Sequence, residues 1–325
     1  MKELIQTLCQ TFGPSGYEEK VAEVIKGYLK GKVDEIRTDA LGNLIAVKKG
    51  TGKKIMLAAH MDEIGVIISY IDDKGFLRFG NVGGVYAHVA LGQRVVFESG
   101  LVGVVWYEEN LDSMKDVKLD KMFIDIGTTS REETEKLVKV GDLAVFTAPT
   151  VEQNGIIISK ALDDRAGCAV LIQTALNAPQ TDNEIYYVFT AQEEVGLRGA
   201  RTAAYGILPD MALAVDVTDI GDIPNCKPMA VKMGQGPTIK IKDSSVMCHP
   251  EVIKKLTEAA QKEGIPYQNE VLLAGGTDAG SIHITAGGIP SGGVSLATRY
   301  IHDTAEMIAL KDAENAVRLL EAFVK

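Results

Sequence analysis

Residues 186–200 read YYVFTAQEEVGLRGA, and this stretch decides the fold and raises the first question about function. The apolar run 186–189 predicts a buried strand, because strands covered on both faces lack polar positions. Small residues follow the run, and then Glu193 and Glu194 stand side by side. Adjacent carboxylates at the end of a buried strand repel each other and are costly to desolvate, so we expect a positively charged partner beside them.

Similar apolar runs lie on both sides of this strand and alternate with helical patterns. The sequence predicts strands at 44–47, 54–59, 211–217 and 292–297, and helices at 165–176, 250–263 and 310–323. This order is typical of an α/β fold, a mostly parallel sheet sandwiched by helices. Two S-x-x-E patterns, Ser15 with Glu18 and Ser130 with Glu133, predict capping boxes at the starts of further helices.

The stretch from 69 to 158 has a different character, with many short strand patterns and few helices. Its first two strands are joined by a turn at 72–75, which predicts a hairpin. Short strands in this number are typical of a small β-barrel or sandwich. The sequence therefore predicts a β-rich domain at 69–158 inserted into a discontinuous catalytic α/β domain, formed by 1–68 and 159–325.

The bulk composition excludes several classes of protein. Hydrophobic residues make up 46% and charged residues 24% of the 325 positions, as in ordinary globular proteins. The net charge of −10 and the lack of a basic stripe argue against nucleic acid as a partner. No apolar stretch predicts a signal peptide or a membrane span, so we expect a cytoplasmic protein. The four cysteines form no C-x-x-C pair and are expected to be reduced thiols.

Polar side chains follow the predicted strands at the points where each strand ends. Ligands in open α/β sheets bind beyond the carboxyl ends of the strands, so these side chains are candidates for one site. His60 and Asp62 point the same way from one strand, and the aspartate could fix the tautomer of the histidine. The complete set is His60, Asp62, Asp163, Asp164, Glu193, Glu194, Asp216 and His302.

Each of these patterns also has an ordinary structural explanation. His60 could be a buried, hydrogen-bonded histidine, one of the two aspartates could cap a helix, and the two glutamates could begin another helix. Their coincidence at one sheet edge favours a pair of divalent metals with mixed nitrogen and oxygen ligands. Two cations would also neutralise the glutamate pair and leave Glu193 free to act on a metal-bound water. Zinc or cobalt suits such ligands, and manganese is an alternative.

Five segments together resemble one known family. HMDEIG (60–65), ALDDRAG (161–167), TAQEEVGLRGA (190–200), AVDVTD (214–219) and TRYIHD (298–303) resemble, in this order, the co-catalytic metallo-aminopeptidases that build tetrahedral (TET) shells. These enzymes are also called glutamyl or deblocking aminopeptidases, and some members were labelled endoglucanases. The resemblance extends from GPSGYE at 13–18 to TAEMI at 304–308, which is nearly the whole chain.

The resemblance implies an assignment for each metal ligand. His60, Asp163 and Asp216 would hold one metal, and Asp163, Glu194 and His302 would hold the other, with Asp163 bridging the two. The Asp163–Asp164 peptide bond would be cis.

The resemblance also implies a mechanism and an assembly. Glu193 would be the general base and acid, and Asp62 would orient His60. A hydroxide bound by the two metals would attack the first peptide bond of a short peptide and release its N-terminal residue. The inserted domain would form dimers, which would assemble into a tetrahedral dodecamer with inward-facing sites.

Other functions remain alternatives at this point. A carboxypeptidase or deacylase of the same clan shares the metal ligands, although in that pattern the first histidine and the bridging aspartate lie closer together. A glycosidase would use two carboxylates but would leave the histidines unexplained. A scaffold that binds metal without catalysis would have no use for Glu193. The side-chain pocket is expected to draw on 273–283 and on the loop around Arg299 and Tyr300. Asp278 and Arg299 could each favour a substrate group of opposite charge, or they could pair with each other.

Overall fold

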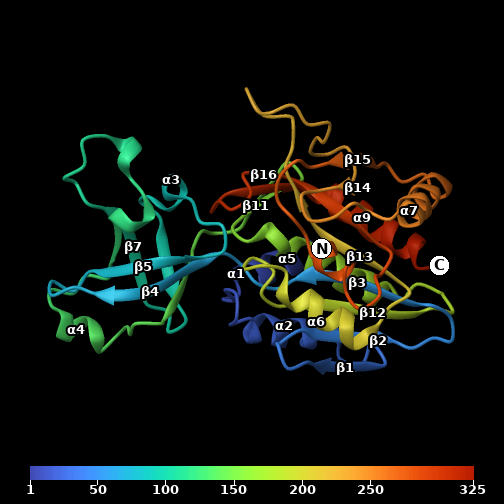
Figure 1. Ribbon diagram of the computed structural model, residues 1–325, viewed down its shortest axis with the longest axis horizontal. Helices are drawn as coiled ribbons and strands as arrows, with labels where there is room; N and C mark the ends of the chain where they lie inside the picture. The colour runs from blue at the N-terminus through green and yellow to red at the C-terminus, as the bar shows by residue number, and fades with distance from the viewer.

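The computed structural model describes residues 1–325 and consists of two bodies, a large α/β domain and a smaller β-barrel that projects from it (Figure 1). The chain starts in the α/β domain, leaves it to form the barrel, and returns to complete it. The predicted fold class, an α/β domain with an inserted β-barrel, is confirmed.

An 11-stranded mixed sheet forms the centre of the large domain, in the order β1-β2-β12-β3-β13-β16-β17-β11-β10. Off this path, β14 pairs with β16, and β15 pairs with β14. The central strands β12, β3, β13 and β16 are parallel, and the flanking pairs on this path are antiparallel. Beside this path, β14 and β15 also pair in parallel. In the centre, the parallel arrangement aligns the carboxyl ends of the four strands. The strands are β1 (Glu35–Thr38), β2 (Leu44–Lys48), β3 (Lys54–His60), β10 (Val151–Gln153), β11 (Ile156–Ser159), β12 (Glu184–Thr190), β13 (Met211–Thr218), β14 (Thr238–Lys242), β15 (Gln268–Val271), β16 (Ser291–Arg299) and β17 (Glu306–Ala309).

Helices cover both faces of this sheet because its central strands are apolar on both sides. Along β12, Tyr187 and Phe189 pack into one core while Tyr186 and Val188 pack into another, as the alternation of a strand requires. The first core includes α1 (Lys2–Gln10), α2 (Glu19–Leu29), α5 (Leu162–Asn177), α7 (Pro250–Lys262) and α9 (Leu310–Phe323). The second includes α6 (Arg198–Ile207) and α8 (Ala279–Ile282).

The inserted domain is a closed antiparallel barrel with strand order β4-β5-β8-β7-β6-β9. Its inward-facing side chains form a hydrophobic core that is separate from those of the large domain. The elements are β4 (Gly65–Ile71), β5 (Leu77–Val82), α3 (Ala87–Ala90), β6 (Arg94–Phe97), β7 (Val102–Tyr107), the short 3-10 helices Met114–Asp116 and Leu119–Lys121, β8 (Met122–Asp125), α4 (Arg131–Glu135) and β9 (Leu143–Phe146).

The ends of the barrel lie close together, since Gly65 at the start of β4 pairs with Val145 in β9. After the barrel, β10 pairs with β11 in the large sheet. The division into 1–68 with 159–325 and an insert at 69–158 stays a prediction, and the barrel strands themselves run from Gly65 to Phe146.

Of the two predicted capping boxes, the one at Ser130 is present in part, because the Glu133 carboxylate accepts from the backbone N–H of Thr129 and not from that of Ser130. The Ser130 hydroxyl accepts a hydrogen bond from the Glu133 backbone N–H at the start of α4. The box at Ser15 and Glu18 is wrong, because α2 begins only at Glu19. Glu18 instead accepts hydrogen bonds from Gly16 and from the distant backbone N–H of Gln192, so tertiary contacts override the local pattern.

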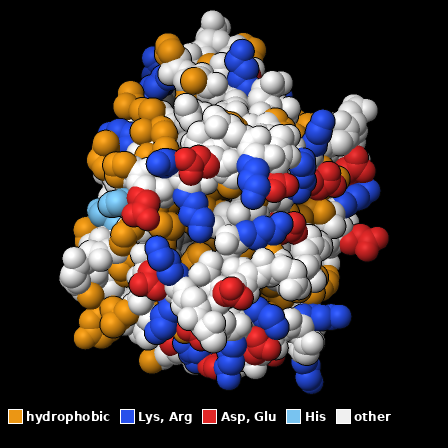
Figure 2. Space-filling view, turned by 90° about the vertical axis from the view of Figure 1, so that its right-hand side faces the viewer, with side chains coloured by type: hydrophobic (Ala, Val, Ile, Leu, Met, Phe, Trp, Pro, Cys, Tyr) orange, Lys and Arg blue, Asp and Glu red, His pale blue; other side chains and the backbone are white.

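The surface carries charges of both signs. Figure 2 shows the face remote from the barrel, where lysine and arginine side chains alternate with aspartate and glutamate and form no single-sign stripe. None of the helices has the length and apolar character needed to cross a membrane. The predicted cytoplasmic location stays a prediction.

Candidate metal centre

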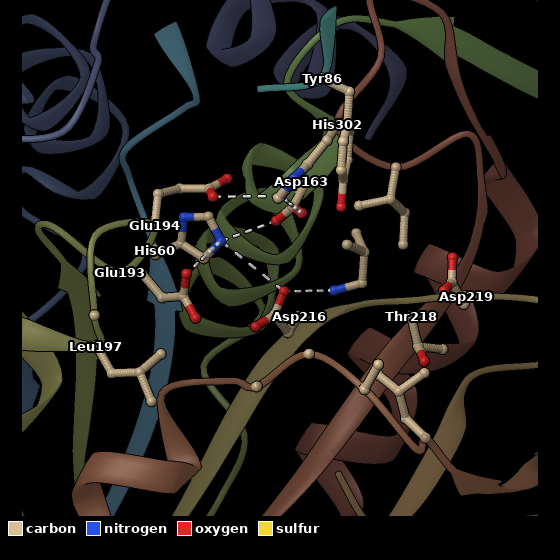
Figure 3. Close-up of a pocket in the computed structure, with 17 residues that line it drawn as sticks. His60, Tyr86, Asp163, Glu193, Glu194, Leu197, Asp216, Thr218, Asp219 and His302 are labelled. Carbon is tan, nitrogen blue, oxygen red and sulfur yellow. Dashed lines mark hydrogen bonds and ion pairs between the residues drawn. The ribbon is translucent and has the colours of Figure 1, made fainter. Parts of the chain in front are cut away.

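The aligned carboxyl ends of the central strands bring the predicted residues together. His60 is the last residue of β3 and lies opposite Thr190, the last residue of β12, so Glu193 and Glu194 follow close to it. Asp216 lies near the end of the next strand, β13. Figure 3 shows these side chains converging with Asp163 and His302 on one cavity.

The residues form the two groups expected from the sequence. Ligand atoms of His60, Asp163 and Asp216 lie within 4.8 Å of one another, and so do those of Asp163, Glu194 and His302. The His60 Nε2 atom is 2.9 Å from Asp163 Oδ1, and the His302 Nε2 atom is 3.4 Å from Asp163 Oδ2. The two oxygens of Asp163 therefore face different histidines, which is the arrangement that a bridging carboxylate needs.

Backbone geometry at the start of α5 sets the direction of the Asp163 side chain. The Asp163–Asp164 peptide bond is cis, as the resemblance implied, and Asp163 and Asp164 have non-helical backbone angles. Asp164 faces away from the two ligand groups. Its carboxylate accepts hydrogen bonds from the backbone N–H groups of His60 and Gly167.

Asp62 lies behind the glutamate pair. Its two oxygens accept hydrogen bonds from the backbone N–H groups of Glu193 at 3.0 Å and Glu194 at 3.1 Å, and the Ser15 hydroxyl donates a third at 2.6 Å. His60 Nδ1 is 3.1 Å from the Asp62 backbone oxygen and 3.5 Å from its Oδ1 atom. Asp62 thus holds the glutamate backbone as well as facing His60, and its role in orienting His60 stays a prediction.

Glu306 performs a similar task on the other side of the site, and sequence reasoning missed it. Its Oε1 atom accepts a hydrogen bond from the backbone N–H of His302 at 2.9 Å, and its Oε2 atom accepts one from that of Asp163 at 3.0 Å. Its side chain is buried. Glu306 therefore ties together two candidate ligands that are far apart in the sequence. The only sequence signal was a glutamate four residues after His302, which is common in loops.

The barrel also contributes to the site. The His302 Nδ1 atom lies 3.0 Å from the backbone oxygen of Gly84, in the segment between β5 and α3. A proton on Nδ1 that is donated to this carbonyl leaves Nε2 free to bind a metal. A side chain at position 84 would collide with the ring, because a Cβ atom there would lie 2.5 Å from Nδ1. Glycine is required at this contact.

The site carries a large excess of negative charge. Burial alone would lower the pKa of His302, but Asp163 and Glu194 outweigh it and raise the pKa to about 12. Burial raises the pKa of Asp216 and Glu193 well above the usual range, and their negative neighbours raise it further. Carboxylates crowded together in this way favour bound cations, which answers the question raised by the adjacent glutamates.

Glu193 stands apart from the two ligand groups. Its Oε2 atom is 3.9 Å from His60 Nε2, and its side chain reaches the same cavity without belonging to either group. It is therefore a partly buried carboxylate beside the candidate metal site.

A cavity of about 490 Å³ opens over these residues, within the size range of ligand-binding pockets. Part of the predicted pocket stretch lines it, namely Ala274, Gly275 and Gly276. Asp278 and Arg299 are absent from its walls: Asp278 accepts a hydrogen bond from the Thr190 hydroxyl, and Arg299 pairs with Asp222. The expected contribution of these two charges to a side-chain pocket is wrong, because each is engaged by another residue.

Comparison with known proteins points to one family. The family model described as M42 glutamyl aminopeptidase matches residues 42–319. A "Putative aminopeptidase" from Acetivibrio thermocellus is 58% identical over 98% of this chain and 97% of its own length. The lysyl aminopeptidase of Pyrococcus furiosus is 33% identical over 99% and 96% of the two chains. Among solved structures, the TET1 peptidase of Pyrococcus horikoshii superimposes with a TM-score of 0.90 at 35% identity, over 99% of this chain and 98% of that one, and is described as assembling into a tetrahedron or a large octahedral shell.

Proposed function

Because the chain belongs to the M42 glutamyl aminopeptidase family and is therefore a peptidase, we propose that it is a dinuclear metallo-aminopeptidase that removes N-terminal residues from short peptides. The observation that carries this proposal is the partly buried carboxylate of Glu193 beside two groups of candidate metal-ligating residues in one cavity. The glycosidase alternative is wrong, since the chain belongs to a peptidase family.

The donor set suits two divalent metals. Each group combines one imidazole nitrogen with carboxylate oxygens, and Asp163 offers one oxygen to each. Such mixed ligands suit zinc and cobalt, with manganese as a further candidate. His60, Asp163 and Asp216 would hold one ion, and Asp163, Glu194 and His302 the other. When bound, the ions would lower the pKa of water and polarise the scissile carbonyl.

Glu193 would serve as the proton carrier. A general base must lie within hydrogen-bond reach of the attacking water and must be free of other strong partners. Glu193 reaches the cavity, and its backbone is held by Asp62, which fixes the position from which its side chain extends. Glu193 would take a proton from water and deliver it to the leaving amine.

The substitution Glu193→Gln tests this role. General acid–base steps contribute about 100- to 10,000-fold, so kcat for leucyl p-nitroanilide should fall by that factor. Elemental analysis should still find two metal ions per chain, because Glu193 is outside both ligand groups. Glu132→Gln, on the barrel surface, is the matched control and should behave as the parent protein does. Near-normal turnover by Glu193→Gln would eliminate Glu193 as the base.

The metal count needs its own measurement. The parent protein should bind two ions per chain, and His302→Ala should reduce the occupancy. One tightly bound ion together with full activity would contradict the dinuclear proposal. A peptide with an N-acetyl group should resist cleavage. This result would distinguish an aminopeptidase from a deacylase that uses similar metal ligands.

We further propose that the protein assembles through its barrel into dimers and then into a hollow tetrahedral dodecamer. The relative TET1 peptidase forms a tetrahedron or an octahedral shell. The outer face of β7 is apolar and exposed at Val102, Val104 and Trp106, which is typical of a surface covered by a partner. Short peptides would enter such a shell, and folded proteins would be excluded.

A further inference from the structure

One charged residue of the cavity wall lies outside the two ligand groups and Glu193. Asp219 directly follows β13, three residues after Asp216. Other parts of the wall are neutral, including Leu197, Leu272 and Ile301. Asp219 is therefore the one carboxylate of the wall that neither the ligand groups nor the proposed base accounts for.

Asp219 has no partner within the protein. No side chain or backbone group donates a hydrogen bond to it, and no cation lies within ion-pairing distance. By contrast, the nearby Asp222 accepts hydrogen bonds from Arg299 and from the backbone N–H of Met233. Burial raises the pKa of Asp219, while His302 and Lys227 lower it from a distance. Asp219 is nevertheless exposed to solvent, so its charge on the cavity wall is open to a cation from outside the chain.

A peptide substrate offers two kinds of cation, the α-ammonium group and the side chain of lysine or arginine. The α-ammonium group adjoins the scissile carbonyl, which must approach Glu193. Figure 3 shows that Asp216 separates Asp219 from Glu193 and His60. The position of Asp219 therefore suits the end of a long side chain better than the α-ammonium group.

Another part of the cavity wall suits the rest of such a side chain. The segment from Leu272 to Gly276 borders the cavity with one aliphatic side chain and with the small residues Ala274, Gly275 and Gly276. Lysine and arginine place their methylene groups along apolar surfaces and direct their charge to a polar partner. A glutamate side chain would meet Asp219 with like charge.

We infer that Asp219 selects peptides whose N-terminal residue is lysine or arginine. This inference rests on the proposed aminopeptidase activity. Family membership alone does not define the preferred N-terminal residue, because the family model carries a glutamyl name and one relative a lysyl name.

Lysine and norleucine anilides provide the test, because norleucine has the same length of side chain without the ammonium group. We expect the metal-loaded parent enzyme to cleave the lysyl substrate with the higher kcat/KM. In Asp219→Asn the ratio of lysyl to norleucyl kcat/KM should fall about two- to fivefold, which is the range for an exposed ion pair. The control Asp182→Asn removes the same charge before the amino end of β12 and should keep the parent ratio.

Several outcomes would overturn the inference. An equal loss for both substrates in Asp219→Asn would assign Asp219 to the α-ammonium group, and an unchanged ratio would deny it any role in selection. If Asp182→Asn lowered the ratio of lysyl to norleucyl kcat/KM equally, the effect would come from the net charge of the protein and not from Asp219. Cleavage of norleucyl anilide with no response at position 219 would leave the aminopeptidase proposal standing, whereas no cleavage of any anilide would refute both.

Discussion

The carboxylates of the site fill two different roles, which depend on what their oxygens face. Asp163, Glu194 and Asp216 present oxygens to the histidines and to each other. Asp62, Asp164 and Glu306 instead accept hydrogen bonds from the backbone of the candidate ligands. These backbone contacts define where the ligand side chains begin, so a residue that never touches a metal can still determine its affinity.

Glu306 offers the clearest test of this second role. Glu306→Gln would replace one accepting oxygen with an NH₂ group that faces the backbone N–H of Asp163 or His302. We expect metal affinity to fall about 10- to 100-fold, as for other residues that orient ligands. Competition with a chelator on the metal-free protein measures this directly. Glu314→Gln on the exposed face of α9 is the matched control, and equal affinities in the two variants would disprove the role.

Asp278 gives a prediction about pH. Its side chain is buried and Oδ1 has no hydrogen-bond partner, and burial raises its pKa from 3.8 to about 6. A carboxyl whose pKa is higher in the folded state stabilises the fold while protonated, and this contribution is lost as the pH rises through about 6. Asp278→Asn does not titrate. The free energy of unfolding of the variant relative to the parent should therefore rise between pH 4 and pH 7, by on the order of 3 kcal/mol.

Urea unfolding of the metal-free proteins at several pH values is the appropriate measurement for Asp278→Asn. Asp182 is exposed, so Asp182→Asn is the control. Its free energy of unfolding relative to the parent should not rise between pH 4 and pH 7. A constant difference for Asp278→Asn would mean that Asp278 is ionised in the folded protein throughout this range.

At the scale of helices and strands, the predictable features are those set by local pattern. The helix predicted at 310–323 coincides with α9, and the apolar runs at 54–59 and 211–217 are central strands. The antiparallel flanks were not predictable, because a short strand such as β10 carries no signal of which strand it will pair with. The failed capping box has the same cause, since the partners of Ser15 and Glu18 lie far away in the sequence.

Candidate ligands were predictable for a related reason. Polar residues that directly follow apolar strands are expected to meet where parallel strands end, and this argument identified eight candidates. The choice of five ligands among them came from the resemblance to the aminopeptidase family, namely His60, Asp163, Glu194, Asp216 and His302. The sequence did not predict a role for Glu306 or Asp219, because a glutamate or aspartate near a strand end is common. Only the three-dimensional contacts of Glu306, and the absence of contacts at Asp219, distinguish them.

The exposed face of β7 carries an element-scale prediction. Val102, Val104 and Trp106 lie on one face of the strand, and Val104→Asp would place a charge in the middle of it. We expect the particle mass from light scattering to drop to that of smaller species while the circular dichroism spectrum is retained. Leu208→Asp adds the same charge at an exposed apolar residue of the large domain and should retain the assembly. An unchanged mass in Val104→Asp would exclude β7 from the interface.

At the scale of the whole molecule, the barrel and the α/β domain have separate hydrophobic cores yet meet at the site. The barrel projects well beyond the large domain and leaves its own outer surface open to partners (Figure 1). The face remote from the barrel bears mixed charges (Figure 2), which limits non-specific association there. Assembly through the barrel would therefore place all copies of the site in similar positions relative to a shared interior.

A substrate-length experiment tests that arrangement. The assembled enzyme should trim an unfolded peptide of roughly ten residues and spare a folded protein with an accessible N-terminus, because closed shells exclude bulky substrates. In the dissociated variant Val104→Asp, the rates at which the peptide and the folded protein are trimmed should be more nearly equal. Equal trimming of both substrates by the assembled parent enzyme would show that no size filter operates.

The contact between Gly84 and His302 has an evolutionary consequence. Inserted domains whose ends lie side by side are readily exchanged, and Gly65 and Val145 give this barrel such ends. Here recombination is restricted, because any replacement must bring a glycine with a free carbonyl to the same point beside His302. The outer strands are free of this constraint, while the segment around Gly84 must stay matched to the loop that carries His302.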